Sequence, residues 1–324
     1  MEIRTLPLDE AHGHILLHNV ADEVGRKRVK KGVPLSEKEL TFLRDLGHQQ
    51  VEVAVLDADD LREDEAAQRI AAALIGTEAR WRATRAVAGR INLHCDGPAV
   101  LYLDEERLRQ LNALRGVTLA TRAAHTPLGT ALATTQAATL KVIPYALPRP
   151  IVEEAAQRAV GLLRLRPLRQ QRVALLLAAE VATADKLLRQ FAAPMEMRLQ
   201  RYGSALAATE SVAPAVAAIA EAAARLLATH DALIVAGQTS IMDIDDRPLR
   251  ALRQIGVQIA LHGAPVEPGN LLALGYRGDQ WIMGAPGCAR SPAHNVVDLV
   301  LPRLLAGEQL GAAEVAALGL GGLL

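Results

Sequence analysis

Apolar and polar positions follow different patterns in the two halves of this chain. The segment 51–55 alternates with a period of two, which predicts a strand buried on one face. The segments 173–177 and 232–236 are instead continuously apolar and are followed by helical patterns. Continuous apolar strands that alternate with helices are typical of a parallel sheet covered on both faces. The predicted fold class is therefore α/β, with a mostly parallel three-layer αβα sheet in the C-terminal domain.

The first half predicts smaller α+β and β-rich regions. A helix is expected from near Ser36, where Ser36 and Glu39 have the spacing of a capping box, to Gly47. A second helix is expected over 64–76. Residues 86–148 are rich in Thr, Val, Leu and Ile and predict strands with one helix near 104–114. After a further helix that runs to about 163, the segment 164–171 with its proline is the best candidate for a linker.

The second half predicts a regular succession of helices and strands. Helices are expected near 186–202, 214–229, 247–255 and 293–305, and further strands at 204–208, 257–261, 271–275 and 280–284. The pattern suggests a small N-terminal unit at 1–60, a β-rich middle region at 61–168, an α/β domain at 169–307 and a C-terminal tail at 308–324.

Composition narrows the possible functions. Half of the 324 residues are hydrophobic, only 2% are aromatic, and 36 basic residues balance 36 acidic ones. A neutral chain with few rings to stack on bases argues against binding to nucleic acid or to an anionic membrane. The two cysteines form no disulfide framework, and neither a signal segment nor a long apolar run is evident. We expect a soluble, cytoplasmic protein.

The strongest candidate for chemistry is the loop 237–246, which follows an apolar strand. In a parallel sheet ligands bind beyond the carboxyl ends of the strands. Gly237 permits a sharp turn, and Thr239 and Ser240 offer hydroxyls and backbone N–H groups. Asp243 and Asp245 supply carboxylates, which suit Mg²⁺ bridged to a phosphate. The alternative is that these acids only cap the helix that follows.

Two other loops follow predicted strands. The loop 284–292 carries Arg290 and Ser291, which would suit a phosphate, although Ser291 followed by proline equally suits a helix cap. The loop 264–270 has two prolines, and a rigid turn is its simpler interpretation. Lys141, inside an apolar strand, is interpreted either as a charge that protects an edge strand or as a phosphate contact.

The order of these motifs resembles a known family. Gly-x-Thr-Ser-x-x-Asp-x-Asp, Pro-Val-x-Pro-Gly-Asn and Gly-x-Pro-Gly follow one another at 237–245, 265–270 and 284–287. They resemble the molybdopterin-binding domain that molybdopterin molybdotransferase shares with molybdopterin adenylyltransferase. The stretch from Lys30-Lys31-Gly32 through the first helix and strand is similar to the small domain that accompanies it in the molybdotransferases. The middle region resembles only a variant branch that is described as molybdopterin-binding.

The resemblance implies roles for individual residues. It places the pterin or its phosphate on Gly237, Thr239 and Ser240, and a metal or molybdate near Asp243 and Asp245. Glu180 falls where molybdotransferases carry an acidic residue and joins both aspartates in the implied catalytic set. Pro268, Gly269, Pro286 and Gly287 would shape the pocket wall. This chain departs from the family pattern at Gln238 and Met242, where the family has glycine, and at Ala178-Ala179, where it has Thr-Gly.

Two functions from different classes follow from the resemblance. The first is a carrier or scaffold of molybdenum cofactor biosynthesis that binds molybdopterin and passes it to a molybdoenzyme or a maturation partner. The second is a Mg²⁺-dependent molybdotransferase that inserts molybdate into adenylylated molybdopterin. The departures favour binding, because Gln and Met restrict the backbone and fill space that glycine leaves open. A remoter alternative is another nucleotide- or sugar-phosphate enzyme. The family also implies a homo-oligomer.

Overall fold

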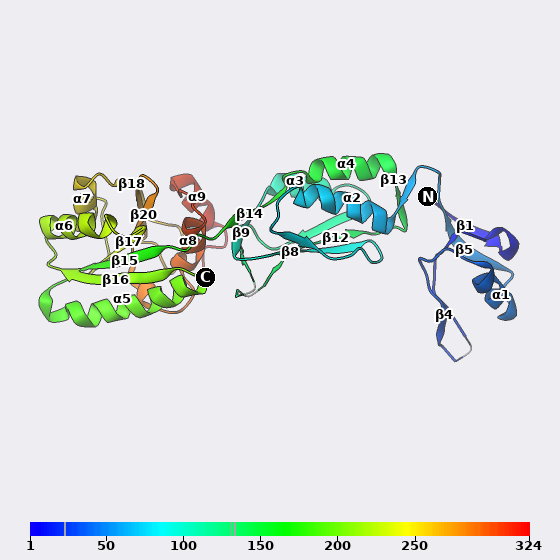
Figure 1. Ribbon diagram of the computed structural model, residues 1–324, viewed down its shortest axis with the longest axis horizontal. Helices are drawn as coiled ribbons and strands as arrows, with labels where there is room; N and C mark the ends of the chain where they lie inside the picture. The colour runs from blue at the N-terminus through cyan, green and yellow to red at the C-terminus, as the bar shows by residue number, and fades with distance from the viewer. Residues whose placement is uncertain (23, 130, 133) are drawn as a thin grey trace. The chain divides into compact units, whose positions relative to one another are not determined.

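The structure is a computed structural model that describes residues 1–22, 24–129, 131–132 and 134–324 (Figure 1). The chain divides into two compact units. Unit 1 comprises Met1–Asp96, Leu101–Thr126 and Thr134–Leu165. Unit 2 comprises Gly97–Val100, Pro127–Ala133 and Arg166–Leu324. Unit 2 therefore takes two short segments from the middle of the chain in addition to its C-terminal half.

Unit 1 begins with a small antiparallel sheet. Strand β5 (Gln50–Val55) lies between β1 (Glu2–Pro7) and β2 (Ile15–Leu16), and helix α1 (Glu37–Asp45) follows the hairpin of β3 (Val20–Ala21) and β4 (Lys27–Val29). The predicted capping box is present: the Ser36 backbone N–H donates to the Glu39 carboxylate over 3.1 Å. Val51 and Val53 are buried while Glu52 is exposed, as the alternation predicts.

The rest of unit 1 contains a four-stranded antiparallel sheet in the order β10-β12-β8-β7. Its strands are β7 (Trp81–Ala83), β8 (Arg90–Cys95), β10 (Val117–Thr121) and β12 (Gln136–Val142). The helices are α2 (Glu63–Ile75), α3 (Glu105–Asn112) and α4 (Arg149–Ala159). The short strands of this part of the chain are β6 (Asp60–Arg62), β9 (Ala99–Leu103), β11 (Pro127–Leu128), β13 (Ala146–Pro148) and β14 (Leu163–Pro167), of which β11 belongs to unit 2 and β9 and β14 each have residues in both units.

The expected linker at 164–171 contains the boundary between the two units, which falls between Leu165 and Arg166, but its first residues belong to strand β14. Leu163 and Leu165 are buried in alternation with the exposed Arg164 and keep the period of a strand. Lys141 does not protect an edge, because β12 lies between β10 and β8. Its ammonium group instead lies 3.6 Å from the buried carboxylate of Glu63, at the start of α2.

Unit 2 is built on a six-stranded sheet in the order β16-β15-β17-β20-β19-β18. The strands are β15 (Arg172–Ala178), β16 (Ala205–Val212), β17 (Ala232–Gly237), β18 (Gln258–His262), β19 (Ala273–Arg277) and β20 (Gln280–Gly284). The pairs β15–β16, β15–β17 and β17–β20 are parallel, whereas β18 and β19 join the sheet antiparallel. The predicted mostly parallel α/β domain is confirmed.

Helices cover both faces of this sheet, which explains its continuously apolar strands. Figure 1 shows α6 (Val216–Leu227) and α7 (Arg247–Gln254) on one face and α5 (Val181–Arg201) on the other. On β15, Ala174 and Leu176 pack in the core under α6 and α7, and the alternate residues are equally buried. The chain continues with α8 (Val296–Leu305) and α9 (Ala312–Ala316). In the described part of the chain, no helix combines the length and hydropathy needed to cross a membrane.

Three boundaries in unit 2 differ from prediction. Helix α5 begins at Val181, five residues earlier than expected, and β16 extends to Val212. Helix α8 begins at Val296 rather than near 293, because its cap is Asn295 and not Ser291. The Asn295 side chain accepts from the Val297 N–H over 3.0 Å and forms a capping box with Asp298.

Candidate functional site

A cavity of about 370 Å³ lies at the carboxyl ends of β15 and β17. Its position is the one at which open α/β sheets bind ligands. Its walls come from the end of β15, the start of α5, the segment before α6 and the loop 237–248. The lining residues are Ala178, Glu180, Pro214, Ile219, Gly237, Gln238, Thr239, Ser240, Ile241, Asp246, Arg247 and Pro248.

The turn at Gly237 brings polar groups to the cavity. A Cβ atom at Gly237 would lie only 2.5 Å from the Thr239 carbonyl oxygen, so this turn requires glycine. Ile241 anchors the loop, because its side chain is buried and its carbonyl oxygen accepts a hydrogen bond from His262 Nε2 over 3.0 Å. Between these fixed points, the hydroxyls and backbone N–H groups of Thr239 and Ser240 have no hydrogen-bond partner among the described residues. These donors are available to a ligand.

The carboxylates of the loop already have partners, in the loop itself or in α7. Asp243 accepts a hydrogen bond from the Asp245 N–H over 2.8 Å, and Asp246 accepts one from the Met242 N–H over 2.8 Å. Asp245 pairs with Arg253, whose Nη1 lies 3.0 Å from Asp245 Oδ1. Asp246 is the N-cap residue of α7, although its side chain makes no capping hydrogen bond. The described residues contain no group of three or more His, Cys, Asp or Glu side chains placed to hold a metal.

Gln238 has a structural role that the sequence did not predict. Its side-chain Oε1 accepts hydrogen bonds from the Glu180 N–H and from the Thr183 hydroxyl, each over 3.1 Å. Its own backbone N–H donates to the Ala178 carbonyl over 2.9 Å. Gln238 thus caps α5 from a loop 58 residues away. Because the sequence pattern placed the helix start near 186, this contact was not predicted.

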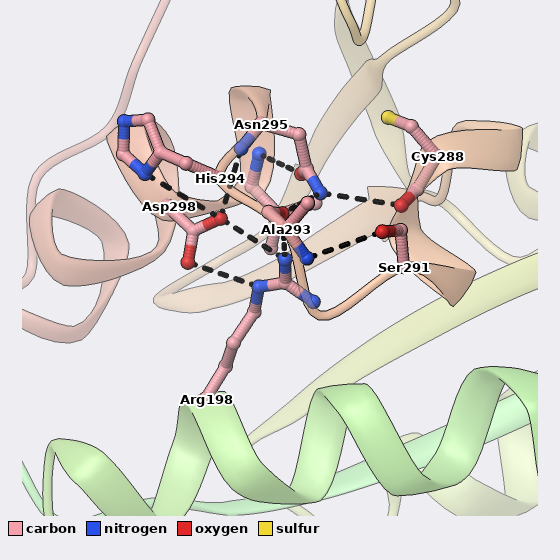
Figure 2. Close-up of polar contacts among 8 residues, drawn as sticks. Arg198, Cys288, Ser291, Ala293, His294, Asn295 and Asp298 are labelled. Carbon is pink, nitrogen blue, oxygen red and sulfur yellow. Dashed lines mark hydrogen bonds and ion pairs between the residues drawn. The ribbon is translucent and has the colours of Figure 1, made fainter. Parts of the chain in front are cut away.

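The loop after β20 is held by a buried ion pair (Figure 2). Arg198 on α5 is 3% exposed, and its Nε and Nη2 each lie 3.0 Å from an oxygen of Asp298 on α8. Arg198 Nη2 also donates to the Ala293 carbonyl over 2.9 Å, while Nη1 is buried without a partner in the described residues. Asn295 donates to the Cys288 carbonyl over 3.2 Å. These contacts fix the loop to α5 and α8.

The polar groups predicted in this second loop mostly serve the loop itself. The Ser291 hydroxyl accepts from the Ala293 N–H over 3.1 Å, and Arg290 Nε donates to the Gly287 carbonyl over 3.2 Å. The Arg290 guanidinium lies over the Phe191 ring, 5.6 Å from its centre. Burial raises the pKa of the Cys288 thiol above its usual range.

The third loop is a packing element. A Cβ atom at Gly269, where φ is +140°, would lie 2.3 Å from Val296 Cγ1, so glycine allows the start of α8 to approach. The Val296 N–H donates to the Pro268 carbonyl over 3.2 Å. Pro268 follows a cis peptide bond.

The structure therefore brings together part of the predicted set. Glu180, Gly237, Thr239 and Ser240 line one cavity, and an ideal Cβ on Gly287 would lie 3.1 Å from Ser240 Oγ, so the first and second loops meet. Within the described ranges, the other predicted residues do not line this cavity: Asp243, Asp245, Pro268, Gly269, Pro286, Arg290 and Ser291. Gln238, Asp246 and Arg247 line it in addition.

Comparisons with known proteins give distant structural matches only. No protein-family model matches the chain, and no curated protein is similar to it. A solved structure of a molybdenum cofactor biosynthesis protein from Pyrococcus furiosus matches with a TM-score of 0.27 and 12% identity over 94% of this chain. Two structures of a molybdopterin biosynthesis moeA protein from Pyrococcus horikoshii match over 94% of this chain with TM-scores of 0.32 and 0.28 and 10% identity.

These matches are too loose to assign a function. This chain spans 64% of the P. furiosus protein and 75% and 74% of the P. horikoshii chains. At such scores the overall similarity does not specify how the backbones superimpose at any one loop. The functional argument therefore depends on the cavity and on the residues that line it.

Proposed function

We propose that this chain binds a phosphorylated pterin, a form of molybdopterin, in the cavity at the carboxyl ends of β15 and β17. In this proposal it acts as a carrier or scaffold in molybdenum cofactor biosynthesis. The observation that carries the proposal is the pair Thr239 and Ser240, whose hydroxyls and backbone N–H groups are unpartnered in the described structure and belong to residues that line the cavity. Donors left open in this way suit an anionic phosphate.

Arg247 supplies a positive charge to the cavity. It lines the cavity and uses Nη1 to donate to the Pro214 carbonyl over 3.0 Å, which fixes the guanidinium while leaving its other N–H groups for a ligand. No aromatic side chain lines the cavity among the described residues. Recognition would therefore depend on hydrogen bonds and charge rather than on ring stacking.

The contacts that the loop carboxylates make favour a binding function over a catalytic one. Asp243 accepts a hydrogen bond inside the loop, Asp245 pairs with Arg253 of α7, and neither carboxylate lines the cavity. This donor set does not fit a Mg²⁺ ion, which takes oxygen ligands in a near-octahedral shell. We therefore derive no metal-dependent step, and the molybdotransferase activity is the alternative that the experiment must exclude.

Calorimetric titration tests the proposal. The wild-type protein is titrated with molybdopterin and with neopterin monophosphate, a stable phosphorylated pterin. We expect binding, and we expect the Thr239→Val/Ser240→Ala variant to bind about 10- to 100-fold more weakly, because the loss of one hydroxyl bond to a charged group costs roughly 1.5–3 kcal/mol and the backbone N–H donors are retained. Thr229→Val is the control, because Thr229 follows α6 and does not line the cavity. Failure of the wild type to bind either compound contradicts the proposal.

A second assay separates carrier from enzyme. Wild type and Asp243→Ala are incubated with adenylylated molybdopterin, molybdate and Mg²⁺, and molybdenum incorporation is measured. The carrier function predicts no turnover by either protein. Turnover by the wild type that the substitution abolishes would support the molybdotransferase instead. Transfer of the bound pterin to a molybdoenzyme, and assembly into a homo-oligomer, are further parts of the proposal that pull-down and light scattering test.

A further inference from the structure

We propose that Glu180 and Gln238 form a subsite that reads the uncharged edge of the ligand's ring, and that this edge is that of a 2-amino-4-oxopyrimidine. The inference rests on the proposed function, because it concerns the same cavity. It goes further by assigning the two ends of the ligand to different residues of that cavity.

The carboxamide of Gln238 is held in one orientation. Its oxygen accepts from the Glu180 N–H and the Thr183 hydroxyl, each over 3.1 Å. A backbone N–H can only donate, so the atom it meets must be the oxygen, and the amide cannot be flipped. The two hydrogens on Nε2 then remain without a partner among the described residues, on a side chain that lines the cavity.

The same contact decides where the phosphate does not bind. The start of a helix such as α5 normally attracts anions through its free N–H groups. Here the neutral oxygen of Gln238 already accepts the Glu180 N–H, and the carboxylate of Glu180 adds a negative charge. A phosphate beside the Glu180 carboxylate would be repelled. The open donors of Thr239 and Ser240 and the positive charge of Arg247 are left for the phosphate.

The chemistry of the pair specifies the ring edge. A carboxylate accepts two parallel hydrogen bonds, which suits the 2-amino group and the adjacent ring N–H of a 2-amino-4-oxopyrimidine. The carboxamide Nε2 donates, which suits the neighbouring 4-oxo group. Pterins and guanine share this edge. A ring in which the 2-amino group is replaced by a second carbonyl would instead face the carboxylate with an acceptor.

The test compares two phosphorylated ligands that differ only at that position: neopterin monophosphate and its 2-oxo counterpart, the corresponding lumazine phosphate. We expect the wild type to bind the pterin at least tenfold more tightly in calorimetric titration. Glu180→Gln should weaken pterin binding about 10- to 100-fold and change lumazine binding less than about threefold, because a charge-assisted hydrogen-bond pair is lost only with the pterin. Glu180 is exposed, so this variant should fold, and circular dichroism checks that it does.

A second variant tests the Nε2 donor of Gln238. Gln238→Glu retains an oxygen that accepts the Glu180 N–H but replaces Nε2 with an acceptor, and we expect about tenfold weaker binding of both ligands, since both carry the 4-oxo group. A third titration, with GMP, distinguishes a pterin from a guanine nucleotide as the ligand that presents this ring edge. Weaker binding of GMP than of neopterin monophosphate is expected for a pterin site.

The outcomes separate this inference from the proposed function. If Thr239→Val/Ser240→Ala weakens both ligands but Glu180→Gln leaves their affinity ratio unchanged, the subsite is overturned and the proposed function stands. If GMP binds more tightly than the pterin and Glu180→Gln weakens it, the subsite stands and the pterin function is overturned. Absence of binding by every ligand overturns both.

Discussion

Two loops of unit 2 leave the sheet at the carboxyl ends of neighbouring parallel strands, and they use similar residues in opposite ways. The loop after β17 leaves the donors of Thr239 and Ser240 without partners beside a cavity. The loop after β20 satisfies its polar groups internally, through Ser291, Asn295 and the buried Arg198–Asp298 pair. Glycine, serine and charge after an apolar strand therefore do not by themselves distinguish a binding loop from a structural one.

The two loops also differ in the elements to which they are bonded. In the first loop, Gln238 is bonded to the start of α5 and Ile241 to His262, so Thr239 and Ser240 between them remain free. The second is tied along its length to α5 and α8. Substitutions in the second loop should therefore reduce the stability of the protein, whereas substitutions of Thr239 and Ser240 in the first loop should reduce ligand binding.

The largest expected effect is the loss of the buried ion pair. Arg198→Met leaves the Asp298 carboxylate, whose side chain is 11% exposed, without its guanidinium partner. Breaking one side of a buried pair costs about 3–5 kcal/mol. Chemical denaturation should show a decrease of that size in the free energy of unfolding.

Two variants control this result. Arg198→Met/Asp298→Asn removes the stranded charge and should recover part of the loss, because an amide oxygen still accepts the Asn295 N–H that Asp298 accepts over 3.0 Å. Arg253→Ala breaks the exposed pair with Asp245 and should cost less than about 1 kcal/mol. A loss below 1 kcal/mol for Arg198→Met would mean that the second loop is not held by this pair.

A smaller effect is expected for Asp246→Ala in the first loop. This carboxylate accepts one hydrogen bond from the Met242 N–H, and its loss should cost about 1 kcal/mol. Because Asp246 also lines the cavity as a negative charge, its removal should leave phosphate affinity unchanged or raise it slightly. Denaturation and titration of the same preparation measure both. A large loss of affinity would show that Asp246 contacts the ligand directly.

The smallest effect is on thiol reactivity and its dependence on pH. Burial raises the pKa of Cys288 above its usual value, so less reactive thiolate is present at pH 8 than for an exposed thiol. We expect Cys288 to react with iodoacetamide several-fold more slowly than a cysteine introduced by Thr239→Cys in the open loop. The difference should narrow as the pH rises through the raised pKa. Mass spectrometry of each alkylated peptide gives the rates, and equal rates at pH 8 would contradict the contrast between the loops.

Local patterns predicted most of the architecture. The apolar runs at 173–177 and 232–236 identified the central strands of unit 2, and the Ser36–Glu39 spacing identified the cap of α1. Each of these signals lies within a few residues of the feature that it predicts. The strand inside the expected linker had such a signal as well, in the alternation of Leu163, Arg164 and Leu165, but Pro167 outweighed it.

The parts that were not predicted depend on contacts between distant residues. The start of α5 has no side-chain cap of its own and is capped by Gln238, so no neighbouring residue marked it. Ser291 and Asn295 both have the chemistry of a cap, and the cap is Asn295, whose capping-box partner Asp298 is held by Arg198 from α5. The partners of Asp243 and Asp245, the Asp245 N–H and Arg253 of α7, likewise depend on the folded loop and could not be predicted from the sequence.

The most direct test of the central claim is the affinity of the wild-type protein for neopterin monophosphate, measured by titration beside the Thr239→Val/Ser240→Ala and Arg198→Met variants at a temperature where all three are folded. The two loops predict that the first variant binds about 10- to 100-fold more weakly at nearly unchanged stability. They predict that the second is less stable but binds within about threefold of the wild type. Equal weakening by both variants, or no binding by the wild type, would contradict the account.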